Sequence, residues 1–95
     1  MTDKKNEIQI KISDDVLKGV YANNVLITHT RGEFLMDFMT IFHPQGILGA
    51  RVIVSPSHAK RIVNALNDNI IKYEKKFGVI EEAEAPPMPE GGVAH

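Results

Sequence analysis

The first apolar positions of the chain alternate strictly with polar ones. In the stretch EIQIKI, isoleucines at positions 8, 10 and 12 alternate with glutamate, glutamine and lysine. A period of two is typical of a strand with one buried face, so residues 7–12 are predicted to form a short strand. Ser13 can then cap a single helical turn, and Gly19 can end it.

Two longer strands are predicted on either side of the turn TRGE. Residues 20–30 are rich in β-branched side chains, and residues 33–42 are mostly apolar. Gly32 tolerates the positive φ that a tight turn can need. The two faces of the later strand carry Phe34, Met36, Phe38 and Phe42 on one side and Leu35, Asp37, Met39 and Ile41 on the other.

A fourth strand is predicted after a loop. Proline and two glycines punctuate the stretch HPQGILG, which is typical of a loop, and residues 50–54 are again strand-like. Strands this close in sequence pair most simply with their neighbours. The four strands are therefore predicted to form an antiparallel meander, with the last three at its centre.

The strongest periodicity of the chain follows in SPSHAKRIVNALNDNIIKYEKKFG. Apolar side chains recur there at steps of three and four, which predicts an amphipathic helix over residues 56–77. Ser55 suits the N-cap, Pro56 the first helical position, and Gly78 the end. The apolar stripe consists of Ala59, Ile62, Val63, Leu66, Ile70, Tyr73 and Phe77. The predicted fold is α+β, a four-stranded antiparallel meander followed by one long C-terminal amphipathic helix.

The ends of the chain lack this periodicity. Residues 79–95 are rich in proline, glycine and glutamate, which predicts a disordered tail. Residues 1–6 are expected to be a flexible N-terminus, which leaves residues 7–78 as a single domain.

Composition narrows the class of protein. The 95 residues include 11 basic and 12 acidic ones, so no strong overall field attracts nucleic acid or an anionic membrane. The absence of cysteine excludes disulfides and thiolate metal sites. The N-terminus does not resemble a signal peptide, and no apolar run approaches the roughly 20 residues of a membrane span. We therefore expect a soluble, cytoplasmic protein without a membrane partner.

The predicted strand over residues 33–42 is apolar on both faces, whereas a single helix covers only one face of a sheet. The second face would expose a larger apolar patch than soluble monomers usually leave bare. We therefore expect a homodimer or higher oligomer. The alternative is that the N-terminal strand and its helical turn cover the second face.

Three motifs resemble a family of short bacterial and archaeal proteins that is catalogued as a domain of unknown function. They are the Tyr-Ala-Asn strand start at Tyr21, the Thr-Arg-Gly-Glu-Phe turn at Thr30, and the Ser-Pro-Ser-His-Ala-Lys helix start at Ser55. The resemblance covers residues 7–78 and implies no activity. The layout of a meander before a helix is also similar to that of SecB-type export chaperones, which assemble through these elements.

Asp37 interrupts an apolar strand face. A buried carboxylate needs a partner, and Arg51 on the neighbouring strand is the expected one, with Arg31 or His29 as alternatives. A structural ion pair, which can lie at a subunit boundary, is favoured over catalysis. The candidate interaction surface consists of Leu35, Asp37, Met39, Ile41 and Arg51.

The stretch HTRGE is the other concentration of polar groups. Its side chains His29, Arg31 and Glu33 form a candidate polar tip, but they lack the activated nucleophile and oriented base of a hydrolase. A solvated hairpin tip is therefore favoured over an active site. His29, His43 and His58 also lack the paired spacing of a metal motif, so neither metal nor cofactor is expected.

The sequence favours a non-catalytic, homo-oligomeric protein-interaction module, an adaptor or chaperone-like binder. Its expected partners are further copies of itself and another protein. The alternative is a nucleic-acid-associated protein that uses the basic face of the C-terminal helix. The candidate phosphate contacts on that face are Lys60, Arg61, Lys72, Lys75 and Lys76. An enzyme is the third interpretation.

Overall fold

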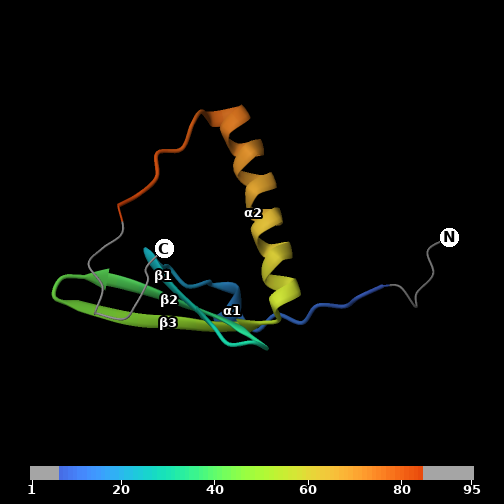
Figure 1. Cartoon of the computed structure of the whole chain (residues 1–95), viewed down its shortest axis with the longest axis vertical. Helices are drawn as coiled ribbons and strands as arrows, with labels where there is room; N and C mark the ends of the chain where they lie inside the picture. The colour runs from blue at the N-terminus through green and yellow to red at the C-terminus, as the bar shows by residue number, and fades with distance from the viewer. Residues whose placement is uncertain (1–6, 85–95) are drawn as a thin grey trace.

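The computed structural model describes residues 7–84 and combines an antiparallel sheet with a long C-terminal helix (Figure 1). This confirms the predicted α+β class. In chain order the elements are α1 (Asp14–Leu17), β1 (Asn24–His29), β2 (Phe34–Phe42), β3 (Gln45–Val54) and α2 (Pro56–Phe77). The predicted flexible residues 1–6, and residues 85–95 of the predicted tail, lie outside the described residues; residues 79–84 contain neither helix nor strand.

In the described residues the sheet has three strands in the order β1-β2-β3, with both pairs antiparallel. The first predicted strand, over residues 7–12, is wrong, so the predicted count of four strands is wrong as well. That segment has no ladder partner and runs away from the sheet (Figure 1), and Ile8 is 86% exposed. A strand forms only where a neighbouring strand satisfies its backbone groups. The single turn that follows is confirmed as α1, since the Ser13 hydroxyl caps it and Gly19 has a φ of 77°.

The predicted loop over HPQGILG is also wrong in its extent. Only His43 and Pro44 form the turn between β2 and β3, and β3 starts at Gln45. Both glycines of the stretch lie inside β3, where Gly46 pairs with Ile41. Glycine therefore marks an irregular strand here and not a break between strands.

Gly49 is the extra residue of a β-bulge. Phe38 pairs with Ala50 and Met39 pairs with Leu48, which leaves Gly49 without an opposite residue. A Cβ at Gly49 would lie 2.6 Å from Cγ1 of Val20. The missing side chain therefore allows the segment before β1 to cross close to β3.

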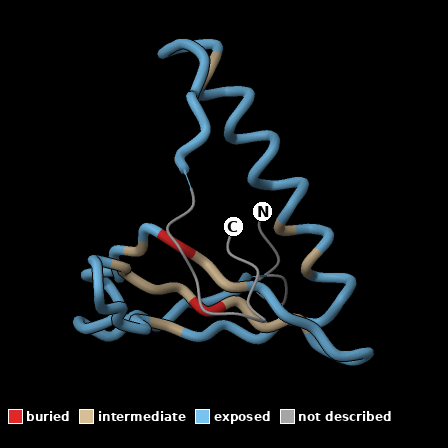
Figure 2. The backbone as a smooth tube through the Cα atoms, turned by 60° about the vertical axis from the view of Figure 1, so that its left-hand side comes forward, coloured by how far each residue is buried: buried red, intermediate tan, exposed pale blue. Residues whose placement is uncertain are grey.

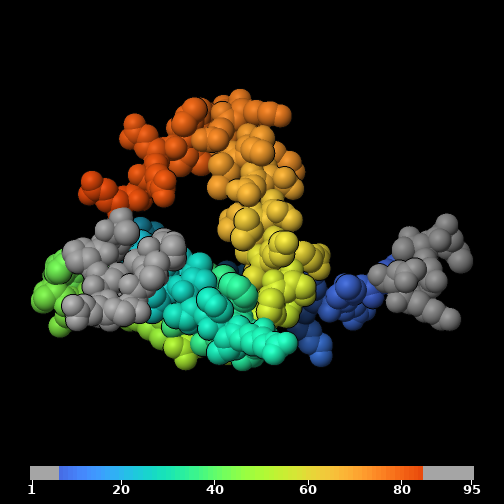
Figure 3. All heavy atoms as spheres, viewed as in Figure 1, coloured from blue at the N-terminus to red at the C-terminus, as the bar shows by residue number. Residues whose placement is uncertain are grey.

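The predicted bounds of α2 are confirmed, because its end signals are local. The Ser55 hydroxyl accepts a hydrogen bond from the backbone N–H of His58 at 3.2 Å, Pro56 starts the first turn, and Gly78 has a φ of 102°. Only Ser55 separates β3 from α2. The helix leaves the sheet at this point, and Figure 3 shows it standing clear of the strands beyond its first turns.

Residues 7–84 contain no buried apolar side chain. The two buried residues in this range are Asn24 and Asp37, which appear in red in Figure 2. The expectation that the helix covers one face of the sheet is wrong, because α2 projects away from it. The predicted apolar residues of the helix, hereafter the α2 stripe, therefore face solvent for most of their length; Leu66 is 58% and Phe77 65% exposed. In the described part of the chain, no helix is long and apolar enough to cross a membrane.

Candidate functional site

The two faces of the sheet form its largest exposed surfaces, and the strand register assigns their residues. One face, hereafter the Asp37 face, carries Leu26, Leu35, Asp37, Met39, Ile41, Leu48, Arg51 and Ile53. The opposite face, hereafter the Phe38 face, carries the apolar residues Val25, Ile27, Phe34, Met36, Phe38, Phe42, Ile47, Ala50, Val52 and Val54 and the polar residues His29, Thr40 and Gln45. The five predicted interaction residues thus all lie on the Asp37 face.

Asp37 and Arg51 form the predicted pair at the middle of the Asp37 face. They are direct cross-strand neighbours, and the Arg51 guanidinium donates from Nε to Oδ1 at 2.6 Å and from Nη2 to Oδ2 at 2.9 Å. The Asp37 side chain is 11% exposed, whereas that of Arg51 is 53% exposed. The guanidinium therefore covers the carboxylate and keeps part of its own surface free.

The pair is held in its ionised form. The hydrogen bond from Arg51 lowers the pKa of Asp37 below its ordinary 3.8, against the opposite effect of partial burial. The same bond raises the pKa of Arg51. The N–H groups of Arg51 that do not bind Asp37 can donate to an acceptor on another molecule. The Asp37 face is thus an apolar surface with one oriented cationic donor at its centre.

The Tyr-Ala-Asn motif has a structural role that its sequence did not predict. The Asn23 amide accepts from the backbone N–H of Ile41 at 2.8 Å and donates to the Ile41 carbonyl at 3.0 Å. Its side chain thus extends the β1–β2 ladder beyond Asn24. Thr40 Oγ1 donates to the Tyr21 carbonyl at 3.0 Å, which fixes the preceding segment against β2. The signal available in the sequence was an asparagine pair directly before a β-branched run.

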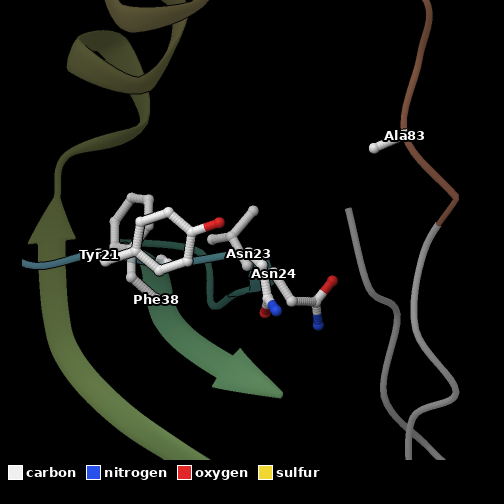
Figure 4. Close-up of a pocket in the computed structure, with 7 residues that line it drawn as sticks. Tyr21, Asn23, Asn24, Phe38 and Ala83 are labelled. Carbon is white, nitrogen blue, oxygen red and sulfur yellow. The ribbon is translucent and has the colours of Figure 1, made fainter. Parts of the chain in front are cut away.

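A pocket of about 440 Å³ lies where this segment enters β1 (Figure 4). It is lined by Tyr21, Ala22, Asn23, Asn24, Val25, Phe38 and Ala83. These residues include no carboxylate, imidazole or amine, and the Asn23 amide is already bonded to Ile41. The pocket therefore offers a mixed apolar and amide surface without a convergent set of acid and base groups.

The predicted polar tip lies at the β1–β2 turn. His29 stacks on Phe34 with ring centroids 5.3 Å apart, and Arg31 and Glu33 are exposed. The turn is closed by a backbone hydrogen bond from Thr30 to Glu33 at 2.9 Å. The ion pair of Asp37 is with Arg51, and neither of the alternative partners, Arg31 and His29, takes part in it.

The structure does not bring the three histidines together. His29 lies at the end of β1, His43 in the turn at the opposite end of β2, and His58 in the first turn of α2. Among residues 7–84 there is no group of three histidine, cysteine, aspartate or glutamate side chains that could hold a metal ion.

The predicted basic residues of α2 are all exposed. They are Lys60, Arg61, Lys72, Lys75 and Lys76. Lys75 and Lys76 lie in the last turn, where the helix dipole favours cations, and the Lys76 ammonium lies 5.2 Å from the centroid of the Phe77 ring. The helix thus presents a solvated basic side opposite its apolar stripe.

Comparison with known proteins gives one family. A family model described as "Protein of unknown function (DUF3467)" matches residues 1–82, in agreement with the resemblance seen in the sequence motifs. Neither the curated proteins nor the solved structures include a significant match to the chain.

Proposed function

From the premise that the chain belongs to the DUF3467 family, whose description assigns no activity, we propose that it is a non-catalytic, homo-oligomeric protein-interaction module. The observation that carries this proposal is the exposed apolar surface. No apolar side chain of residues 7–84 is buried, although the α2 stripe and both sheet faces are apolar. In the described residues, the surfaces that a small domain normally buries against each other are thus largely open.

The energetics of these surfaces favour self-association. A domain of this size must bury more than half of its surface to fold stably, and each large aliphatic side chain contributes about 1.5–3 kcal/mol when fully buried. In the described part of the chain most of this stabilisation is missing, because many of the large aliphatic side chains are about half exposed. A second copy supplies both kinds of missing surface, a helix stripe and a sheet face, in one association.

The Asp37 face supports the binding of another protein. Its apolar residues Leu35, Met39 and Ile41 surround the Asp37–Arg51 pair, and Arg51 keeps free donors. An extended segment that combines apolar side chains with a carboxylate or carbonyl acceptor complements this surface. An adaptor or a chaperone-like binder uses such a surface without any catalytic group.

Self-association is tested by light scattering on the full chain at micromolar concentration. The expected mass is at least twice the 10.6 kDa of one chain. A stable, folded species of 10.6 kDa would refute the homo-oligomeric part of the proposal.

Protein binding is tested by affinity capture from cell lysate with analysis of both protein and nucleic acid. The control is Leu35→Ser, which reduces the apolar surface of the Asp37 face and leaves the ion pair in place. Proteins captured by the wild type and lost with Leu35→Ser support the proposal. Capture of the same proteins by both would contradict the assignment of this face.

The alternative function is nucleic-acid association through α2. The observation in its favour is the exposed basic side of a helix that projects away from the sheet. Phosphate contacts make affinity fall steeply as salt rises, whereas apolar contacts do not. Binding of labelled duplex DNA that weakens steeply with salt, and is lost in a Lys75→Glu and Lys76→Glu double variant, would favour this alternative.

A further inference from the structure

The link between β3 and α2 has an unusual length. Only Ser55 lies between the last residue of the strand and the first of the helix. Its backbone is extended, with φ −69° and ψ 156°, and Pro56 disfavours the helical alternative for the residue before it. Connections that fold a helix back over its own sheet usually contain about 2–6 residues. The link is therefore too short and too stiff for α2 to reverse onto the strands that precede it.

This restriction explains why the α2 stripe lies in solvent. The half-buried members of the stripe, Ala59 and Ile62, lie in the first two turns, next to the sheet. From Val63 onward its members are exposed, and the tilted pair of Tyr73 and Phe77 has ring centroids 4.9 Å apart. The stripe is regular over the whole helix, so its outer part requires a surface that its own chain does not present.

The Phe38 face is the surface that fits the stripe best. Its positions in β1, β2 and β3 include no aspartate, glutamate, lysine or arginine, whereas the Asp37 face is interrupted by its ion pair. The segment before β1 crosses this face beside Phe38 and Thr40, so its open part is the half toward Phe34 and Val54. The open half, from Phe34 to Phe38, is about 17 Å long, which corresponds to about three turns of α2.

We propose that two copies exchange their helices, so that the α2 stripe of each copy packs on the Phe38 face of the other. The inference rests on the self-association proposed above and specifies its geometry. Each chain has one unpartnered stripe and one uncharged apolar face, and a two-fold pair satisfies both at once. The Asp37 face and the basic side of α2 stay open in this arrangement.

The two helix contacts supply one part of a dimer interface. An open half-face about 17 Å long with a contact strip about 10 Å wide gives roughly 170 Å² on the sheet and as much on the helix. Two symmetric contacts of this kind bury roughly 700 Å² in total, whereas specific interfaces bury about 1,200–2,000 Å². The proposed exchange therefore requires further contact between the two copies beyond the helices.

A longer link tests the exchange directly. Insertion of Gly-Ser-Gly-Ser between Val54 and Ser55 preserves the Ser55 cap and lets α2 fold back onto its own Phe38 face. At micromolar concentration the mass by light scattering is expected to fall from twice 10.6 kDa to 10.6 kDa, with helix content retained by circular dichroism. The same insertion after Gly78 is the matched control and should leave the dimer intact.

Crosslinking provides a second readout that does not depend on the insertion. The chain contains no cysteine, so a pair introduced by substitution reacts without background. With a short bismaleimide, the Leu66→Cys and Met36→Cys double variant should give a covalent dimer, because Leu66 lies mid-stripe and Met36 on the Phe38 face. Leu66→Cys with Leu35→Cys on the opposite face, and Leu66→Cys alone, are the controls and should stay single chains.

Three outcomes would overturn the exchange while leaving self-association in place. They are a dimer that survives the insertion before Ser55, crosslinking of Leu66→Cys with Leu35→Cys but not with Met36→Cys, and covalent dimers of Leu66→Cys alone. Each of these outcomes would mean that the α2 stripe packs on a surface other than the Phe38 face of the second copy. A wild-type chain that is monomeric and folded at micromolar concentration would instead refute the proposed self-association itself.

Discussion

Adding one methyl group at Gly49 tests the packing of the segment before β1. In Gly49→Ala the new Cβ would lie 2.6 Å from Cγ1 of Val20, whereas carbon atoms in favourable contact lie about 3.5–4.0 Å apart. Val20, together with the chain leading to Asn23, must therefore move by about 1 Å. Gly46→Ala is the matched control on the same strand, because its nearest neighbour, Cγ1 of Ile41, is at 3.5 Å.

The size of the effect follows from two opposing contributions. Overpacking in a rigid site costs about 1–3 kcal/mol. We expect a cost in the lower half of this range for Gly49→Ala, because Val20 is 59% exposed and can move outward. Replacing glycine by alanine also restricts the unfolded chain, which returns about 0.4–1 kcal/mol where the backbone conformation allows it. Gly49→Ala is thus expected to lower the free energy of unfolding by about 1 kcal/mol, and Gly46→Ala to leave it unchanged or slightly raised.

The assay is urea denaturation followed by circular dichroism, at one fixed protomer concentration because assembly shifts the midpoint by mass action. Val20→Ala in the Gly49→Ala background removes the clashing methyl groups, so the double variant should be more stable than Gly49→Ala alone. Equal midpoints for Gly49→Ala and Gly46→Ala would show that Val20 does not pack on Gly49 in solution, and the crossing described for this segment would then be wrong.

Further substitutions at Asn23 and at the Asp37–Arg51 pair test the site. Asn23→Ala removes both hydrogen bonds to Ile41 and is expected to reduce stability by about 1 kcal/mol in the same denaturation assay; an unchanged midpoint would contradict the ladder extension. Asp37→Ala and Arg51→Ala should each reduce stability, and their double variant by less than the sum, whereas additive losses would show that the pair is not coupled. Because the pKa of Asp37 is lowered in the folded state, the pair stabilises fully above the ordinary pKa of 3.8 and loses this contribution as pH falls through the lowered value. The melting temperature of the wild type should therefore decrease more than that of Asp37→Asn as the pH is taken from about 5 to about 2; parallel decreases would refute this role.

Local chemistry explains which elements the sequence predicted correctly. The bounds of α2 depend on Ser55, Pro56 and Gly78, which act within one turn of the helix and need no tertiary partner. The start of β3 depends instead on the tightness of the turn at His43 and Pro44 and on a bulge that places Gly49 next to Val20. A glycine that ends a strand and a glycine that permits a close approach look the same in a single sequence.

The candidate site was predictable to the extent that it follows from strand alternation. Alternation placed Asp37 on an apolar face, and the need of a carboxylate for a partner pointed to Arg51 on the next strand; the bidentate contact between them confirms that reasoning. The role of Asn23 was not predictable in this way. An amide that replaces a backbone unit is recognised only when the opposite residue, here Ile41, and its unpaired backbone groups are known.

Two of the predictions that failed, the strand over residues 7–12 and the helix covering the sheet, have a common physical feature. In both segments the apolar periodicity is clear, and in both the side chains lie exposed in the single chain, as at Ile10 and Leu66. A regular spacing of apolar residues indicates that one face of an element is buried, but it does not indicate whether the same chain or another one buries that face. Beyond Ile62 the α2 stripe lies away from its own sheet, and the helix exchange proposed above would give it a surface on a second copy.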